Sequence, residues 1–284
     1  MRTRLSAAVV VSLALCLSSV LAAGPDEKAP PNPPGRIELP KDQGTWTGEI
    51  PAGKTIEVKS LVGPIRVEPA TGSATTVEIR RIVPPGVADD PVVHVVSHEK
   101  GVTICPVYSP SDPEKPNECV PGRGKGRMKS PLWEKGVTFE YVVHVPAGVN
   151  FAGETATGAI TGKLLESDVD VKTFKSEIRL LTGRSTKAEG MRGVTVELAP
   201  TTVERRVELK VYNSTGTVLI PRRTKYWYGV DVLNGQIRAA DGPKIEVAGQ
   251  SRKASKSGGP STMPSTTITI DTINGDAVLD AAPD

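Results

Sequence analysis

The stretch "TTITIDTINGDAVLD", Thr266 to Asp280, contains two strand-like patterns separated by a turn. β-Branched residues alternate with polar ones up to Ile273, an Asn-Gly pair interrupts the run, and the alternation then resumes. A period of two places every second side chain on the same face of a strand. Gly and Asn-Gly accept a positive φ or a tight bend. The stretch therefore predicts a strand, a sharp corner and a second strand whose apolar face lies on the same side.

The same pattern recurs upstream, around corners predicted at Gly63, Gly158, Ser176, Gly216 and Gly235. The clearest copies have one apolar residue five positions before the corner and another two positions after it: Val58 and Ile65, Val211 and Val218, Val230 and Ile237. Successive corners are separated by 176 − 158 = 18, 216 − 176 = 40, 235 − 216 = 19 and 275 − 235 = 40 residues. These spacings indicate a unit of about twenty residues, with two units in each longer interval.

A single unit of this kind cannot bury its own apolar face, so neighbouring units have to stack. Stacking would bury columns of Val and Ile in about five or six rungs after Phe151. We expect an all-β fold, built as a β-solenoid or β-helix-like stack of short strands with Gly or Asn-Gly corners. The alternative is an antiparallel β-sandwich, whose hairpins also use Asn-Gly turns.

The beginning of the chain has the pattern of an export signal. Arg2 and Arg4 precede the apolar run Ala7–Leu17, and small residues follow it. Residues 1–23 are therefore predicted to be a signal peptide, which would make the protein exported, either periplasmic or extracellular. The alternative is a retained N-terminal anchor. Once the signal is removed, no membrane span is expected.

The rest of the chain divides by composition. Residues 24–44 are rich in Pro and predict a disordered spacer. Residues 45–284 predict one all-β domain, with a looped insert at 105–131 and a polar insert at 249–264.

Composition and charge exclude some partners. The chain is 38% hydrophobic but only 4% aromatic, and it contains 28 Gly and 25 Pro, which favours many short strands. The net charge of +3 falls to 3 − 2 = +1 if Arg2 and Arg4 leave with the signal. So small a charge favours neither nucleic acid nor an anionic membrane as a partner.

Two cysteines remain after the signal, which would remove Cys16. Cys105 and Cys119 flank the Pro-rich stretch "PVYSPSDPEKPNE". In an oxidising compartment such a pair predicts a disulfide at the base of a loop. A metal pair, the competing interpretation, would need closer cysteines and more ligands.

The three histidines do not predict a metal site. His94 and His98 are four residues apart and would share one face of a strand, so His144 or another neighbour would have to supply a third ligand. We expect these histidines on an exposed strand face instead.

No motif predicts catalysis or a cofactor. The chain has no Gly-x-Ser-x-Gly elbow and no phosphate-binding loop. Asp168 and Asp170 would share a strand face, but acidic residues are too common in this chain to mark a glycosidase pair.

Two segments are candidates for a binding surface. "GRGKGRMK", Gly122 to Lys129, would present Arg123, Lys125 and Arg127 to an anionic envelope polymer, with a solvated flexible loop as the alternative.

The second segment is "RRTKYWYGV", Arg222 to Val230. Alternation would turn Tyr226 and Tyr228 to one face and Trp227 to the other. Aromatic residues beside Arg222 and Arg223 are typical of carbohydrate or protein contacts, and capping the end of the stack is the alternative role.

The segments "IEVKSLVGPIRVEP", "VVHVPAGVNFAGETATGAITG" and "ITIDTINGDAVL" together resemble the DUF4097 family of bacterial adhesin-type domains. The resemblance covers about residue 50 to residue 284. It implies an exported or membrane-associated protein with a β-solenoid-like stack and repeated Asn-Gly corners. It implies no catalytic residues, and the inserts at 105–131 and 249–264 depart from the family pattern.

Two classes of function remain. The first is a non-catalytic exported module for binding, adhesion or scaffolding in the bacterial cell envelope, whose partner would be an envelope protein, a glycan or a second copy of itself. The second is a polysaccharide-active lyase or hydrolase on a β-helix-like scaffold. Acidic, Lys or Arg side chains from adjacent rungs converging in one groove would favour the enzyme.

Overall fold

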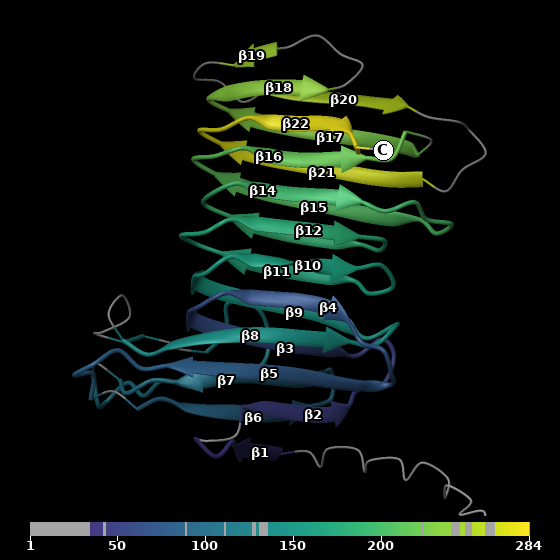
Figure 1. Ribbon diagram of the computed structural model, residues 1–284. Helices are drawn as coiled ribbons and strands as arrows, with labels where there is room; N and C mark the ends of the chain where they lie inside the picture. Colours follow the sequence, from purple (N-terminus) through teal and green to yellow (C-terminus); the bar gives the residue numbers. More distant parts are fainter. Residues whose placement is uncertain are drawn as a thin grey trace, which may run out of the picture. The chain divides into compact units, whose positions relative to one another are not determined.

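Two β-sheets of 11 strands each make up the described part of the chain (Figure 1). The computed structural model describes residues 35–283, except 42–43, 89, 111, 127–128, 131–135, 223, 240–244, 248–251 and 259–264. The chain divides into units after Pro30, and everything described belongs to the second unit. Among the described residues there is no helix that could cross a membrane. The predicted signal peptide, residues 1–23, lies outside the described residues.

The strands of each sheet lie side by side in an order that differs from their order in the sequence. Across sheet A the strands are β1 (Gly35–Glu38), β6 (Val92–His98), β7 (Gly101–Val107), β3 (Thr55–Val62), β9 (Asn150–Thr157), β11 (Val169–Thr173), β13 (Thr186–Gly190), β15 (Arg205–Tyr212), β21 (Ser265–Ile273), β17 (Lys225–Leu233) and β20 (Arg252–Gly258). Across sheet B they are β19 (Ile245–Val247), β18 (Gly235–Ala239), β22 (Ala277–Ala281), β16 (Gly216–Ile220), β14 (Val194–Leu198), β12 (Ile178–Thr182), β10 (Ile160–Leu164), β4 (Ile65–Pro69), β8 (Thr138–Val145), β5 (Ala74–Ile82) and β2 (Thr45–Glu49).

One strand of sheet A and the following strand of sheet B, joined by a corner, form a rung. The rungs β9–β10, β11–β12, β13–β14 and β15–β16 follow one another both in sequence and in space (Figure 1). Each of their strands pairs in parallel with the equivalent strand of the next rung. Among the described strands, antiparallel pairs occur only toward the two ends of the sheets. The central rungs therefore lack the antiparallel pairing that the sandwich alternative requires.

The core lies between the two sheets and consists of columns of apolar residues. Ile65, Ile160, Ile178 and Val194 are in register on four neighbouring strands of sheet B, and each is 0% exposed. Sheet A contributes similar columns. This arrangement confirms that stacking buries Val and Ile that a single rung would leave in water.

The last rung of the chain does not lie at the end of the stack. The rung β21–β22 lies between β15–β16 and β17–β18, so the chain passes this position and returns to it. Asparagine side chains at the corners are hydrogen-bonded to one another in the order in which the rungs lie in space, not in the order of the sequence. Asn274 donates from Nδ2 to Asn213 Oδ1 at 3.0 Å, and its own Oδ1 accepts from Asn234 Nδ2 at 2.9 Å.

The structure corrects the predicted alignment at Gly216. Gly216 is in register with Val194 and Ala277, so it occupies a core column, and Ser214 stands at the corner. Positive φ in the Asn-Gly corners belongs to the asparagine, with 55° at Asn274. The glycine is needed for a different reason, because a Cβ at Gly275 would lie 1.8 Å from the main-chain oxygen of Ser214.

Two predicted segments and one predicted interval between corners also differ from the structure. The spacer predicted at 24–44 includes β1, which pairs with β6, while residues 24–34 lie outside the described part. The polar insert predicted at 249–264 includes β20, which pairs with β17. The 40-residue interval before Gly216 does contain a second unit, the rung β13–β14, whereas the interval before Gly275 contains the edge strands β19 and β20. Regular backbone pairing at a sheet edge thus orders residues whose composition predicts a loop.

Candidate functional site

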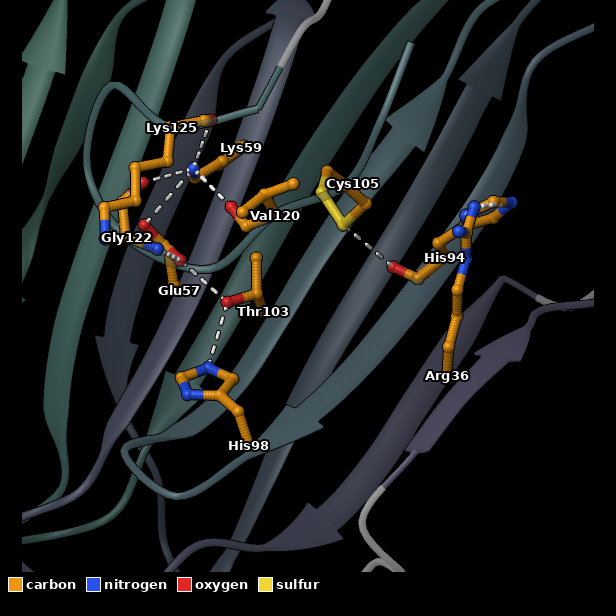
Figure 2. The surroundings of a disulfide bond; sticks show 11 residues. Arg36, Glu57, Lys59, His94, His98, Thr103, Cys105, Val120, Gly122 and Lys125 are labelled. Carbon is orange, nitrogen blue, oxygen red and sulfur yellow. Dashed lines mark hydrogen bonds and ion pairs between the residues drawn. A yellow bond between two sulfur atoms is a disulfide. The ribbon is translucent and has the colours of Figure 1, made fainter. Parts of the chain in front are cut away.

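A disulfide anchors the loop that follows β7. Cys105 on β7 and Cys119 are joined, with their Cα atoms 5.8 Å apart, and both side chains are buried. The Sγ atom of Cys119 lies 3.9 Å from the main-chain oxygen of His94 on β6 (Figure 2). The bridge predicted from sequence is therefore present, and it holds the described residues of the segment 108–130, all but 111, 127 and 128, against the outward face of sheet A. We call these residues the docked loop.

A buried lysine on sheet A, covered by the docked loop, binds the loop to the sheet. Lys59 on β3 is 1% exposed, and its Nζ donates to three loop carbonyl oxygens, those of Val120 at 2.8 Å, Gly122 at 2.5 Å and Lys125 at 3.0 Å (Figure 2). The carboxylate of Glu57 lies 3.7 Å from the same Nζ. A buried charge is stable only when paired and fully hydrogen-bonded, and these contacts meet that condition.

The tip of the docked loop is held by carboxylates from three further strands. Arg123 pairs with Asp170 on β11 and donates to Glu189 on β13 at 2.9 Å. The amide of Gly124 donates to Glu154 on β9 at 3.0 Å. The predicted anion-binding residue Arg123 is thus paired within the chain, so this part of the loop is docked on the sheet.

Burial and charge act in opposite directions on the two carboxyls that hold Arg123. Burial raises the pKa of Asp170 above its ordinary value, although the charges of Arg123 and Lys187 oppose it. Burial would also raise the pKa of Glu189. There, a hydrogen bond and the charge of Lys172, with the charge of Arg123, outweigh burial and lower the pKa.

A groove of about 480 Å³ lies beside the docked loop, over the outward face of sheet A. Outward side chains of β9, β11, β13 and β15 line it, among them Ala152, Asp170, Lys187 and Glu208. The loop segment 121–123 and Lys125 line it from the other side, and His98 and Lys100 line it from the turn between β6 and β7. Charged side chains from successive rungs thus converge in one hollow.

His98 and Glu57 line the groove, and the buried hydroxyl of Thr103 joins them in one chain of hydrogen bonds. Thr103 donates to Glu57 at 2.7 Å, and its Oγ1 lies 3.1 Å from His98 Nε2 (Figure 2). The amide of Lys100 donates to His98 Nδ1 at 3.3 Å. Because the hydroxyl proton goes to Glu57 and Nδ1 accepts, His98 must donate from Nε2 to Thr103.

This direction of proton donation excludes His98 as the base that would activate Thr103 as a nucleophile. A general base has to accept the hydroxyl proton, and here the imidazole donates to the hydroxyl. Thr103 is also completely buried. Burial lowers the pKa of His98, which is consistent with a neutral ring. The hydrogen-bonded chain holds the docked loop through Glu57, which also accepts from the amide of Gly122 at 2.9 Å.

The three histidines lie in two different environments. His94 faces outward from sheet A but is only 5% exposed, covered by Arg36 and Glu38 of β1, so the prediction of an exposed face is wrong for this residue. His144 is on sheet B beside Glu68 and Glu78. Within the described residues, no group of three His, Cys, Asp or Glu is placed to hold a metal ion.

The aromatic segment lies on β17, away from the disulfide. Tyr226 and Tyr228 stack with their ring centres 6.3 Å apart, and Tyr228 is buried, whereas Trp227 is 44% exposed on the opposite face. The predicted alternation is therefore present. Arg222 precedes β17 and lines, with Tyr226, a second hollow of about 330 Å³. Arg223 lies outside the described residues, as does Arg127 of the basic segment.

Sequence reasoning missed the residues that build the groove. Glu57 and Lys59 stand at alternate positions in "IEVKS", where alternation alone makes them exposed. The signal that could have found them is the nearby disulfide loop, because a Pro-rich loop has few main-chain partners of its own and needs donors from elsewhere.

Comparisons with known proteins return only distant similarity. No protein-family model matches the sequence, and no curated protein matches it. Among solved structures, a "putative cell adhesion protein" from Clostridium sporogenes is 11% identical, with a TM-score of 0.41, over 84% of this chain and 99% of that chain. A "putative adhesin" from Bacteroides fragilis is 8% identical, with a TM-score of 0.26, over 83% of this chain and 95% of that chain. Similarity at this level carries no conclusion about function.

Proposed function

We propose that this protein is an exported, non-catalytic binding module of the bacterial cell envelope, built on a β-solenoid-type scaffold of the kind implied by its resemblance to DUF4097 domains. Its binding site is the groove beside the docked loop. The observation that carries the proposal is the groove itself, a hollow fixed by a disulfide, a buried lysine and ion pairs.

A groove of this construction is preorganised for binding. The segment of the docked loop that lines it is tied at both ends, by Lys59 below and by Arg123 at the tip, so little conformational entropy remains to be lost when a ligand binds. Thr103 is completely buried, so its hydroxyl is out of reach of a substrate, which favours binding over acyl or glycosyl transfer through this residue.

Export is supported by two independent features. The first 23 residues have the charge and hydropathy pattern of a signal peptide. The disulfide between Cys105 and Cys119 fits an oxidising compartment, periplasmic or extracellular. N-terminal sequencing of the protein recovered outside the cytoplasm should begin near residue 24, and a chain that still begins at Met1 would contradict signal cleavage.

The enzyme remains a second candidate because charged side chains from successive rungs converge in the groove, which is the arrangement expected to favour an enzyme. Burial raises the pKa of Asp170 in the groove, and Glu208 also lines the groove, so two carboxyl groups with different environments are present there. Release of reducing ends or unsaturated sugars from an acidic polysaccharide, lost in Asp170→Asn, would establish the enzyme. The ion pair with Arg123 favours the binding module, since it occupies the carboxylate.

The binding proposal is tested by filling the groove. Ala152 lies on the groove floor, so Ala152→Trp would block it without changing any charge. Thr195→Trp places the same side chain on the outward face of sheet B and is the matched control. Capture of envelope polymers by the immobilised full-length protein should be lost in the first variant and kept in the second. Equal capture by both variants would overturn the groove as the binding site.

A further inference from the structure

The floor of the groove continues across the sheet to the exposed tryptophan. Arg206 on β15 is in register with Thr267 on β21, and Thr267 is in register with Trp227 on β17. On the other side, residues at the start of successive rungs extend the same row toward β9. We call the complete row the track; it consists of Asn150, Asp168, Ser185, Arg206, Thr267 and Trp227.

Hydrogen bonds between rungs fix the first part of the track. Asp168 donates its amide to Asn150 Oδ1 at 3.2 Å, and Ser185 donates its amide to Asp168 Oδ1 at 3.1 Å. The amide of Arg206 then donates to Ser185 Oγ at 3.1 Å. With neighbouring strands about 4.8 Å apart, the track crosses five strand spacings and is about 24 Å long.

Trp227 forms a flat platform at the far end of the track. A Cβ at Gly229 would lie 3.2 Å from Trp227 Cη2 and 3.6 Å from Cζ3, so the indole lies along the strand over this glycine. Gly229 is in register with Thr269, the next outward position of β21. The absence of a side chain at residue 229 thus allows the ring to lie flat on the sheet, with one face toward solvent.

Exposed cations outnumber exposed carboxylates among the residues that line the groove. Asp170 is paired with Arg123, whereas Asp168 is exposed and keeps its negative charge, although its Oδ1 accepts the amide of Ser185. Lys187 and Arg206 extend from neighbouring rungs and are exposed, and the guanidinium of Arg206 lies 3.8 Å from the carboxylate of Glu208.

We propose that the track binds a linear acidic polysaccharide running across the rungs, with a sugar ring on Trp227 and acidic groups at Arg206 and Lys187. The proposal rests on the binding function above and names its ligand class. A flat, exposed indole presents a π-face suited to the C–H groups of a sugar ring, and guanidinium and ammonium groups suit carboxylates. The closed face of a sheet offers no free main-chain edge, so an extended peptide strand cannot be added there.

The test measures affinity for polygalacturonate by titration calorimetry, with the full-length protein and two probes for comparison. Dextran has sugar rings without charge, and polyphosphate has charge without rings. We expect polygalacturonate to bind more tightly than either probe, and to bind more weakly as salt is added. Trp227→Ala should weaken binding at least about tenfold, and so should Lys187→Gln combined with Arg206→Gln.

Matched controls separate the track from general surface effects. Ile273→Ala removes an equally exposed apolar side chain, 42% against 44%, from the corner end of β21, the strand beside β17. Lys163→Gln removes an exposed charge from sheet B. Both controls should bind as the unaltered protein does.

Three results would overturn the ligand class. They are equal binding by Trp227→Ala and Ile273→Ala, equal binding of polyphosphate and polygalacturonate, and capture of a peptide in place of the glycan. If Ala152→Trp abolishes envelope capture while Trp227→Ala does not, the proposed function stands and the inference about the track falls. If Ala152→Trp has no effect, the groove itself is refuted.

Discussion

The central rungs, Asn150 to Ile220, and the N-terminal part, Gly35 to Val145, are built from the same alternating strands but are held together differently. In the central rungs every strand repeats the contacts of its neighbour, and the cohesion is distributed over columns of equivalent residues. In the N-terminal part, antiparallel strands carry the docked loop, which depends on a few individual groups. A repetitive structure should tolerate substitution at most positions, because many equivalent contacts share the stabilisation. The attachment of the docked loop depends instead on a few single residues.

The largest effect is expected at a stack corner. Gly275→Ala would place a Cβ 1.8 Å from the main-chain oxygen of Ser214, so the two rungs have to separate, at a cost of about 4 kcal/mol or more. Gly216→Ala is the matched variant. Its Cβ meets only side-chain methyl groups at 3.0 and 3.2 Å, and it should cost about 1 kcal/mol. Denaturant unfolding measures both, and equal losses would show that Gly216 is also a corner.

The docked loop should depend on Lys59. Lys59→Met leaves the Glu57 carboxylate and three loop carbonyls without their common donor, which should cost between about 3 and 5 kcal/mol. Lys172→Ala breaks a more exposed pair with Glu189 and should cost less than about 1 kcal/mol. Limited proteolysis should cut residues 108–130 faster in the first variant only. Equal cutting in both would mean that the loop is held by other contacts.

The disulfide should contribute slightly less than Lys59. Replacing Cys105 and Cys119 together by Ser opens a loop with a sequence separation of 14, which should cost about 3 kcal/mol. The loss is measured as a lower melting temperature, and reductant should lower that of the unaltered protein similarly. Mass spectrometry without reductant should find one intramolecular bridge, and free thiols at both positions would contradict the structure.

A smaller effect is expected from acid at the N-terminal edge. Burial, with the charge of Arg36, lowers the pKa of His94 below its ordinary value of 6.5, while Glu38 opposes them. Below pH 6.5 the unfolded chain therefore takes up a proton that the folded chain refuses, and stability falls as the pH drops toward the folded pKa. In the variant His94→Gln, the melting temperature should depend less on pH in this range. An unchanged pH profile in that variant would remove His94 as the cause.

The smallest effect is expected at a buried arginine of the central rungs. Arg205 is 4% exposed, burial lowers its pKa to about 10, and its Nη2 has no hydrogen-bond partner among the described residues. Arg205→Met should therefore cost no stability, because the apolar side chain removes a poorly solvated charge. Arg205→Ala serves as the control for lost volume and should be less stable than the Met variant. A large loss in both variants would assign the guanidinium a structural role through Thr266 and Ala199.

The sequence alone predicted the strands and most corners, since their pattern is local. Alternation identified strands such as Ile65–Pro69 and Ile178–Thr182, and the 40-residue interval before Gly216 indicated the rung β13–β14, whose corner the alignment of glycines did not include. The alignment failed at Gly216, because the register there is set by the neighbouring strands and Ser214 can also occupy a corner.

The site was predictable only in part. The disulfide and the alternation of Tyr226, Trp227 and Tyr228 follow from spacing. The burial of Lys59 does not, since it depends on a loop more than sixty residues away covering an otherwise exposed face. The track that joins the groove to Trp227 could not be predicted from the order of the strands in the sequence. It forms because β21, which follows β17 in the sequence, lies between β15 and β17 in the sheet.

The sequence by itself determined an all-β chain of short strands, its corners and its cysteine pair, because backbone period, turn chemistry and spacing are properties of neighbouring residues. Only the tertiary structure decided the order of the rungs, the groove and the track. These arise from contacts between residues distant in the chain, whose free energy depends on which faces the stack brings together.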